Sequence, residues 1–258
     1  MPALLDPHVH LSEAPAAAEL EALLRRAAQA GVSLVISASA KVSDWTSARR
    51  RKREYLFGNS EKIRVREAFG IHPWHARTIP PDWEPALRRA LAEEDAPLIG
   101  EVGLDYGPKG LVSASKPEQR ALFRRQLEIA DELALPAVVH SFRAGGETLE
   151  TAGNFKRIPC ILFHGYLEPV PRAKMEERFF FSFSPREAGT GRRKGREAVR
   201  RLAETAPEQI LAESDYPACG QEPAGIVRTA ELLRELGARP RTAAGRFLAA
   251  VGESSSEK

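Results

Sequence analysis

The chain has 258 residues, of which 43 % are hydrophobic, so it can bury a sizeable core. Its formal net charge of +3 excludes strong long-range attraction of polyanions by the molecule as a whole. Two cysteines cannot build a disulfide framework, and no apolar stretch approaches the ~20 residues that cross a bilayer. We therefore expect a cytoplasmic protein with no membrane partner and no obligate protein partner.

Short apolar runs alternate with segments of helical spacing from one end of the chain to the other. The predicted strands are residues 3–6, 33–37, 64–69, 98–101, 137–139, 160–163, 179–183 and 209–212. The predicted helices are residues 16–30, 44–56, 82–93, 118–133, 193–205, 224–236 and 242–251. This alternation predicts an α/β fold, a (β/α)8 barrel of the TIM type, because parallel strands are joined by crossover helices.

No internal repeat and no Gly/Ser linker divides the chain. We therefore predict one barrel domain over residues 1–251, followed by a disordered polar tail over residues 252–258.

Histidines and carboxylates follow five of the predicted strands, and in a parallel barrel these positions meet at one mouth. Imidazoles and carboxylates hold borderline divalent ions, and six such ligands would crowd a single ion. The pattern predicts two divalent ions, Mg, Mn or Zn, with Glu101 as the bridging ligand. The predicted metal ligands are His8, His10, Glu101, His140, His164 and Asp215.

Two ions ~3.5 to 4 Å apart would lower the pKa of a shared water, give a metal-bound hydroxide and neutralise phosphoryl charge. Asp215 is the predicted proton acceptor, since one of its oxygens stays free, whereas both oxygens of Glu101 are committed as a bridge. Asp6 and Asp105 are candidates to fix the tautomers of the imidazoles.

Four motifs in chain order resemble the TatD family of metal-dependent hydrolases. They are DPHVHL at residues 6–11, GIHPW at 70–74, IGEVGLDY at 99–106 and ESD at 213–215. The resemblance implies an amidohydrolase-like barrel that acts as a deoxyribonuclease or other phosphodiesterase, with nucleic acid as the substrate. It also implies that His72 contacts the substrate. The implied ligands are His8, His10, Glu101 and Asp215 for one ion, and Glu101, His140 and His164 for the other.

The chain departs from the family pattern in two loops at the mouth. After His140 the family usually has Ser-Arg, an acidic residue and Ala, but Phe142 takes the arginine position here and Arg143 follows it. Arg143 would reach a phosphate from there, or the loop would offer an apolar wall to a base. After His164 the family's Cys-Phe-Ser-Gly is replaced by residues 165–168, GYLE. These changes predict a divergent member with intact hydrolytic chemistry and a different or narrower substrate.

Other side chains are candidates for contact with a substrate. Trp74 would stack on an unpaired base or pack beneath a loop. The basic run at residues 49–53, RRRKR, is interpreted first as a solvated helix face. The basic residues 192–194, with Arg196, open a helix nearer the mouth, which favours contact with a nucleic-acid backbone there.

Two rival interpretations stay open at this point. The same chemistry would hydrolyse a carbonyl ester or amide, for example an aminoacyl-tRNA ester or a lactone. Alternatively, the barrel is a non-catalytic binding protein whose altered loops adapted to a partner.

Overall fold

The computed structural model describes residues 4–13, 16–58, 61–108 and 113–252, so nearly all of the predicted tail lies outside the described residues. A parallel path of eight strands runs in the order β1-β2-β4-β5-β6-β7-β8-β9. Their bounds are β1 (Leu4–Val9), β2 (Val32–Ala38), β4 (Glu61–Phe69), β5 (Leu98–Asp105), β6 (Ala137–Phe142), β7 (Ile161–His164), β8 (Phe179–Phe183) and β9 (Ile210–Ala212).

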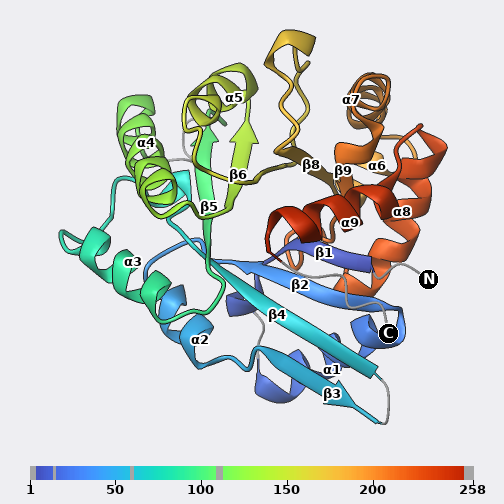
Figure 1. Ribbon diagram of the computed structural model, residues 1–258, viewed down its shortest axis with the longest axis horizontal. Coiled ribbons are helices and arrows are strands. Elements are labelled where there is room, and N and C mark those ends of the chain that lie inside the picture. Colours follow the sequence, from blue (N-terminus) through green and yellow to red (C-terminus); the bar gives the residue numbers. More distant parts are fainter. Residues whose placement is uncertain (1–3, 14–15, 59–60, 109–112, 253–258) are drawn as a thin grey trace.

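Helices flank these strands on the outside, as Figure 1 shows for α3 and α4 on one side and α8 on the other. Their bounds are α1 (Ala17–Gln29), α2 (Asp44–Arg50), α3 (Trp83–Ala92), α4 (Lys116–Leu133), α5 (Gly145–Gly153), α6 (Pro185–Ala188), α7 (Arg193–Ala203), α8 (Ile226–Glu235) and α9 (Pro240–Ala250). The predicted TIM-type barrel is confirmed. No helix in the described ranges is both long enough and apolar enough to cross a membrane.

The barrel is nearly closed by contact between its first strand and the chain that follows its last. Val9 pairs with Tyr216 in a parallel bridge, and the His10 amide donates to the Tyr216 carbonyl at 2.7 Å. The Asp215 amide donates to the His8 carbonyl at 3.2 Å. The two ends of the sheet therefore meet beside the positions from which the first and last predicted ligands project.

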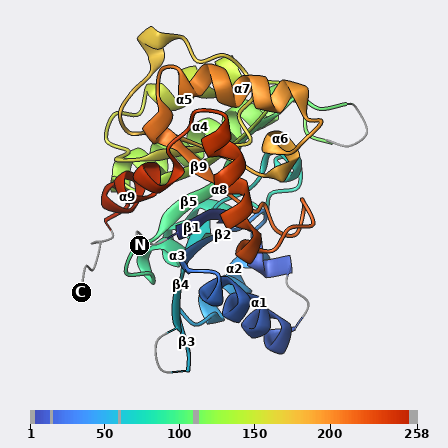
Figure 2. The same ribbon diagram turned by 90° about the vertical axis from the view of Figure 1, so that its right-hand side faces the viewer.

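Alternate residues of each strand supply two hydrophobic clusters, because successive side chains of a strand point to opposite faces. Leu34 and Ile36 of β2 belong to a smaller cluster that includes Phe247 of α9. The intervening Val35 belongs to the larger cluster, which packs against the surrounding helices. Figure 2 shows α5 and α7 at the opposite end of the molecule from α1 and the short strand β3 (Glu54–Phe57).

The predicted helix over residues 44–56 is wrong in its second half. Helix α2 ends at Arg50, and residues Glu54–Phe57 form β3, which pairs antiparallel with β4. The consecutive aromatic and aliphatic residues there suit a strand better than a helix, and exposed positions alternate with buried or partly buried ones along β3.

The basic run at residues 49–53 is not simply a solvated face. Arg51 forms an ion pair with Glu67 of β4, and their side chains are only 5 % and 0 % exposed. Arg53 pairs with Glu94 through two nitrogens. Because the chain leaves the helix after Arg50, these two guanidinium groups turn towards the strands and hold β3 and β4 in place.

Candidate metal centre

His8 lies within β1, and His10 follows that strand directly. The pairing of β1 with β2 shifts by one residue between Asp6 and Val9, which marks a bulge around Pro7. Proline has no N–H to donate to the neighbouring strand, so this is where the chain tolerates a bulge. The bulge sets the direction of the His8 imidazole, which is completely buried.

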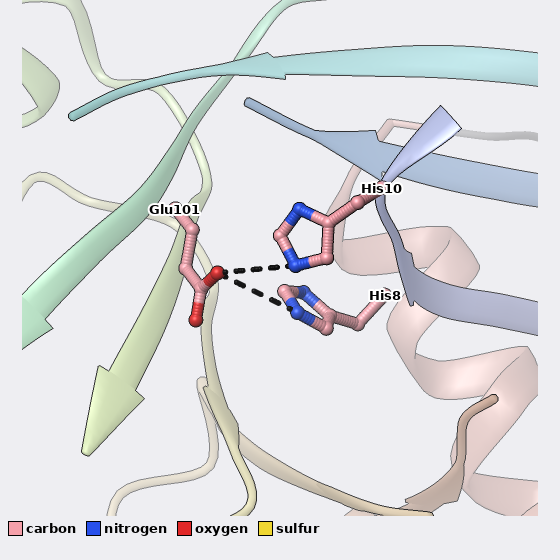
Figure 3. Close-up of side chains that lie close together, drawn as sticks. All are labelled: His8, His10 and Glu101. Atoms are coloured by element: carbon pink, nitrogen blue, oxygen red, sulfur yellow. Dashed lines mark ion pairs between the residues drawn. The ribbon is translucent and has the colours of Figure 1, made fainter. Parts of the chain in front are cut away.

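Glu101 of β5 faces histidines with both of its carboxylate oxygens. Its Oε2 lies 3.7 Å from His8 Nε2 and 3.4 Å from His10 Nε2, and Figure 3 shows these three side chains pointing toward one another. Its Oε1 lies 3.0 Å from His140 Nδ1 and 3.8 Å from His72 Nε2. A carboxylate that divides two sets of imidazoles in this way has the arrangement of a ligand shared by two cations.

Several buried polar atoms of this cluster have no hydrogen-bond partner among the described residues. Both ring nitrogens of His8 are in this position. Burial lowers the pKa of His8 well below its ordinary value and that of His72 to about 3, so both imidazoles are neutral. A neutral imidazole binds a metal through its lone pair, and a buried lone pair with no other partner fits that role.

His140 of β6 is fixed by its neighbours on β5. Gly103 pairs with His140 in the sheet, and a Cβ atom at Gly103 would lie 2.0 Å from the His140 carbonyl oxygen, so only glycine allows this approach. The Nε2 atom of His140 lies 3.3 Å from Asp105 Oδ2, which also accepts a hydrogen bond of 2.6 Å from Trp74 Nε1. Asp105 therefore contacts an imidazole, as the sequence predicts.

His164, at the end of β7, has a carboxylate partner that was not predicted from the sequence. Its Nδ1 lies 2.6 Å from Oε1 of Glu213, which is completely buried. The His164 ring stacks on that of His8, with ring centroids 4.0 Å apart. Glu213 thus fixes the orientation of His164 and leaves Nε2 as the nitrogen available to a ligand. In the sequence, the feature that could have identified Glu213 was its position two residues before Asp215.

Asp6 does not contact an imidazole ring through a hydrogen bond, so its predicted role in fixing a tautomer is wrong. Its Oδ1 accepts from the backbone amides of His8 and Ser214, at 3.4 and 3.1 Å. Because Asp6 is adjacent to the bulge, its side chain turns toward the backbone that joins β1 to the end of β9. Asp6 therefore links the backbone of β1 to the backbone that follows β9, beside the candidate metal centre.

The predicted ligands come together in groups that share His8 or Glu101. Three groups have ligand atoms within 4.8 Å of one another: His8 with His10 and Glu101, His8 with His164 and Asp215, and His72 with Glu101 and His140. His164 thus lies with His8 and Asp215, and His72 stands beside His140.

The three predicted substrate contacts lie in different surroundings. His72 is buried against Glu101 and His140, whereas the Trp74 side chain is 50 % exposed. The guanidinium of Arg143 lies over the Phe142 ring, 5.4 Å from its centroid.

Comparisons with known proteins agree with this architecture. The model of the TatD related DNase family matches residues 5–245. The human deoxyribonuclease TATDN3 is 29 % identical over 238 residues, which cover 85 % of this chain and 80 % of that protein. The metal-dependent hydrolase YabD of Bacillus subtilis is 27 % identical over 222 residues, which cover 83 % of this chain and 80 % of that protein.

Among solved structures, the TatD homologue YJJV of Escherichia coli has the same fold. It superposes with a TM-score of 0.76 at 23 % identity, and the match covers 96 % of this chain and 95 % of that one. The family model spans almost every element that carries a candidate ligand, from His8 to Asp215. The chain therefore belongs to the TatD related DNase family and is a metal-dependent hydrolase.

Proposed function

We propose that this protein is a deoxyribonuclease that hydrolyses phosphodiester bonds with two divalent ions. The observation that carries the proposal is the position of Glu101, whose two oxygens face separate sets of imidazoles. The relatives named as deoxyribonucleases support the choice of substrate. We also propose that residues 1–251 form one hydrolase domain, because Val9 pairs with Tyr216 where the barrel closes and Arg66 of β4 donates a hydrogen bond of 2.7 Å to the Val251 carbonyl.

We assign His8, His10, Glu101 and Asp215 to one ion, and Glu101, His140 and His164 to the other. The distances of 3.4 to 3.8 Å from His8 and His10 to the two carboxylates support the first set. The second set is supported by His140 beside Glu101 and by the 5.9 Å between the ring centroids of His140 and His164. When bound, the ions activate a water and neutralise charge on the phosphoryl oxygens.

Asp215 accepts the proton of the attacking water in this proposal. Its Oδ1 faces His8 Nε2 at 3.8 Å, and its Oδ2 accepts a hydrogen bond of 3.1 Å from the Cys219 thiol. Arg186 Nη1 lies 3.8 Å from the same Oδ2 and brings a cation to the mouth, where it faces the phosphate. Glu101 stays in place as a ligand, because its two oxygens are both directed at imidazoles.

His72 and Trp74 are proposed to contact the substrate beside the scissile phosphate. The buried His72 imidazole is neutral, so it contributes a hydrogen bond and not a charge. Trp74 is anchored through its indole nitrogen to Asp105 while half of its side chain remains exposed for stacking on a base. Arg143 contributes positive charge near the mouth from its place over Phe142.

The test is release of nucleotides from single-stranded DNA by protein stripped with chelator and reloaded with Mg, Mn or Zn. We expect activity to depend on the metal and to fall at least about a thousandfold in Glu101→Gln, in keeping with loss of a catalytic metal site. Circular dichroism would show that the variant is folded. Cleavage of a carbonyl ester such as p-nitrophenyl acetate, with DNA left intact under every metal, would overturn the proposal.

A further inference from the structure

A cavity of about 490 Å³ opens beside the metal centre, and His140 and His164 form part of its wall. This volume lies in the range of about 300 to 1,000 Å³ that is typical of pockets for small ligands. The remaining wall comes from the last residues of β6, from the residues that follow β7 and from the first turns of α6 and α7. Anything bound there therefore lies next to the reacting centre.

One wall of this cavity is cationic and is formed by Arg186, Arg192, Arg193 and Lys194. In the part of the chain that the structure describes, neither Arg192 nor Lys194 pairs with a carboxylate, and all four side chains belong to exposed residues. Arg193 pairs only with Glu197 of its own helix, at 3.6 Å. Arg186 lies 3.8 Å from Asp215, so Arg192 and Lys194 are the two cations of this wall that no carboxylate among the described residues neutralises.

The cationic wall is held in place by tight contact between α6 and α7. Gly195 is buried, and a Cβ atom there would lie 2.3 Å from the Glu187 carbonyl oxygen, so glycine is required for this packing. Arg196 Nη1 donates to the Ala188 carbonyl at 2.9 Å. Residues 192–194 consequently start a helix whose position relative to the cavity is fixed.

Another part of the cavity wall is apolar, and it is formed by Phe142 and Leu167. Their side chains are 40 % and 37 % exposed, which is unusual for large hydrophobic residues. Phe142 stands where the resemblance to the TatD family leads us to expect arginine. An exposed ring beside unpaired cations suits a nucleotide, because a base stacks on an aromatic ring while its phosphate needs positive charge.

We propose that this cavity binds one nucleotide of a single-stranded nucleic acid, with its unpaired base on Phe142 and Leu167 and its phosphate on Arg192 and Lys194. The inference rests on the proposed function and adds to it the site that holds the strand. A base must leave its pair to lie on Phe142, so duplex DNA does not use this wall. Phe142 thus supplies an apolar contact where other members of the family place a charge.

The phosphate part is tested by the affinity of the purified protein for a short fluorescein-labelled oligothymidylate. Its phosphorothioate linkages resist hydrolysis and keep the charge. Fluorescence anisotropy across a range of salt concentrations gives the slope of log K against log[salt]. Arg192→Gln with Lys194→Gln should weaken binding and reduce that slope by about 0.7, because one neutralised phosphate on a single strand contributes about 0.7. The matched control is Arg200→Gln with Arg228→Gln, two exposed arginines outside the cavity.

The base part is tested with Phe142→Ala and the same oligonucleotide. Loss of one stacked base should weaken binding about five- to hundredfold and leave the salt slope unchanged. An otherwise identical oligonucleotide made of abasic units should bind both proteins equally. Leu133→Ala removes a comparably exposed apolar side chain from α4 and serves as the control.

Two results would overturn the inference. One is a salt slope for the Arg192 and Lys194 variant equal to that of its control. The other is an equal effect of Phe142→Ala on the base-bearing and abasic strands. If the wild-type protein binds and hydrolyses DNA in either case, only this binding site is wrong. If the wild-type protein neither binds nor hydrolyses DNA, the proposed function fails together with it.

Discussion

Replacement of Glu213 by glutamine should weaken metal binding although Glu213 is not itself a proposed ligand. Its Oε1 lies 2.6 Å from His164 Nδ1, and its side chain has 0 % exposure. Glutamine keeps the size of the side chain and removes its charge. A hydrogen bond to a charged partner contributes about 1.5 to 3 kcal/mol. That range agrees with the roughly 10- to 100-fold loss of metal affinity that follows removal of a carboxylate behind a ligating histidine.

Isothermal titration of Mn²⁺ into chelator-stripped protein measures this effect directly. We expect the affinity of at least one ion to fall about 10- to 100-fold in Glu213→Gln. Glu67→Gln is the matched control, because Glu67 is equally buried but pairs with Arg51 and not with a histidine. It should lower the melting temperature and leave metal affinity unchanged. The reasoning is refuted if Glu213→Gln melts at a lower temperature but binds Mn²⁺ as tightly as the wild type.

Three further predictions concern buried residues that are not themselves candidate ligands. Arg51→Ala removes the nearer ion-pair partner of the buried Glu67 and leaves only Arg53 Nη1 at 3.6 Å among the described residues, so the free energy of unfolding should fall by about 3 kcal/mol, and a change below about 1 kcal/mol in urea denaturation would contradict this. Gly103→Ala places a methyl group against the His140 carbonyl and should destabilise the fold by at least about 3 kcal/mol, so a thermal melt like that of the wild type would exclude the clash. Burial raises the pKa of the Cys160 thiol, so folded protein at pH 8 should leave it unlabelled by iodoacetamide while urea-unfolded protein reacts, as mass spectrometry would show.

The barrel strands were predictable because buried parallel strands have a strong sequence signature. The run of aromatic residues at 179–183 gives β8 with its observed bounds. In β5 the predicted strand stopped at Glu101, whereas pairing with β6 continues to Asp105. The end of such a strand contains glycine and polar residues near the mouth, so an apolar run in the sequence stops before the strand does.

Segments whose structure depends on distant partners were harder to predict. Helix α5 begins at Gly145 and was not expected from its sequence, because glycine is a poor helix former. The carboxylate of Glu168 accepts hydrogen bonds from the amides of Gly145 and Gly146, at 2.9 and 3.0 Å. These hydrogen bonds give acceptors to the first backbone N–H groups of the helix. Because Glu168 lies 22 to 23 positions away in the sequence, no local pattern predicts them.

The candidate ligands were predictable as a set, whereas their carboxylate partners were predictable only in part. Side chains at strand ends meet because the barrel closes, so His8 and Asp215 approach within 3.8 Å from opposite ends of the chain. Which carboxylate orients which imidazole depends on the direction of each side chain. Asp6 and Asp105 were both candidates for this role; Asp105 contacts His140, whereas Glu213 is the residue that contacts His164.

Anomalous diffraction from crystals of the Mn²⁺-loaded protein tests the central claim most directly, because it locates the ions without reference to activity. The account predicts two peaks on either side of Glu101, one within bonding distance of His8 and His10 and the other within bonding distance of His140. A single peak, or two peaks that do not share the Glu101 carboxylate, would contradict it.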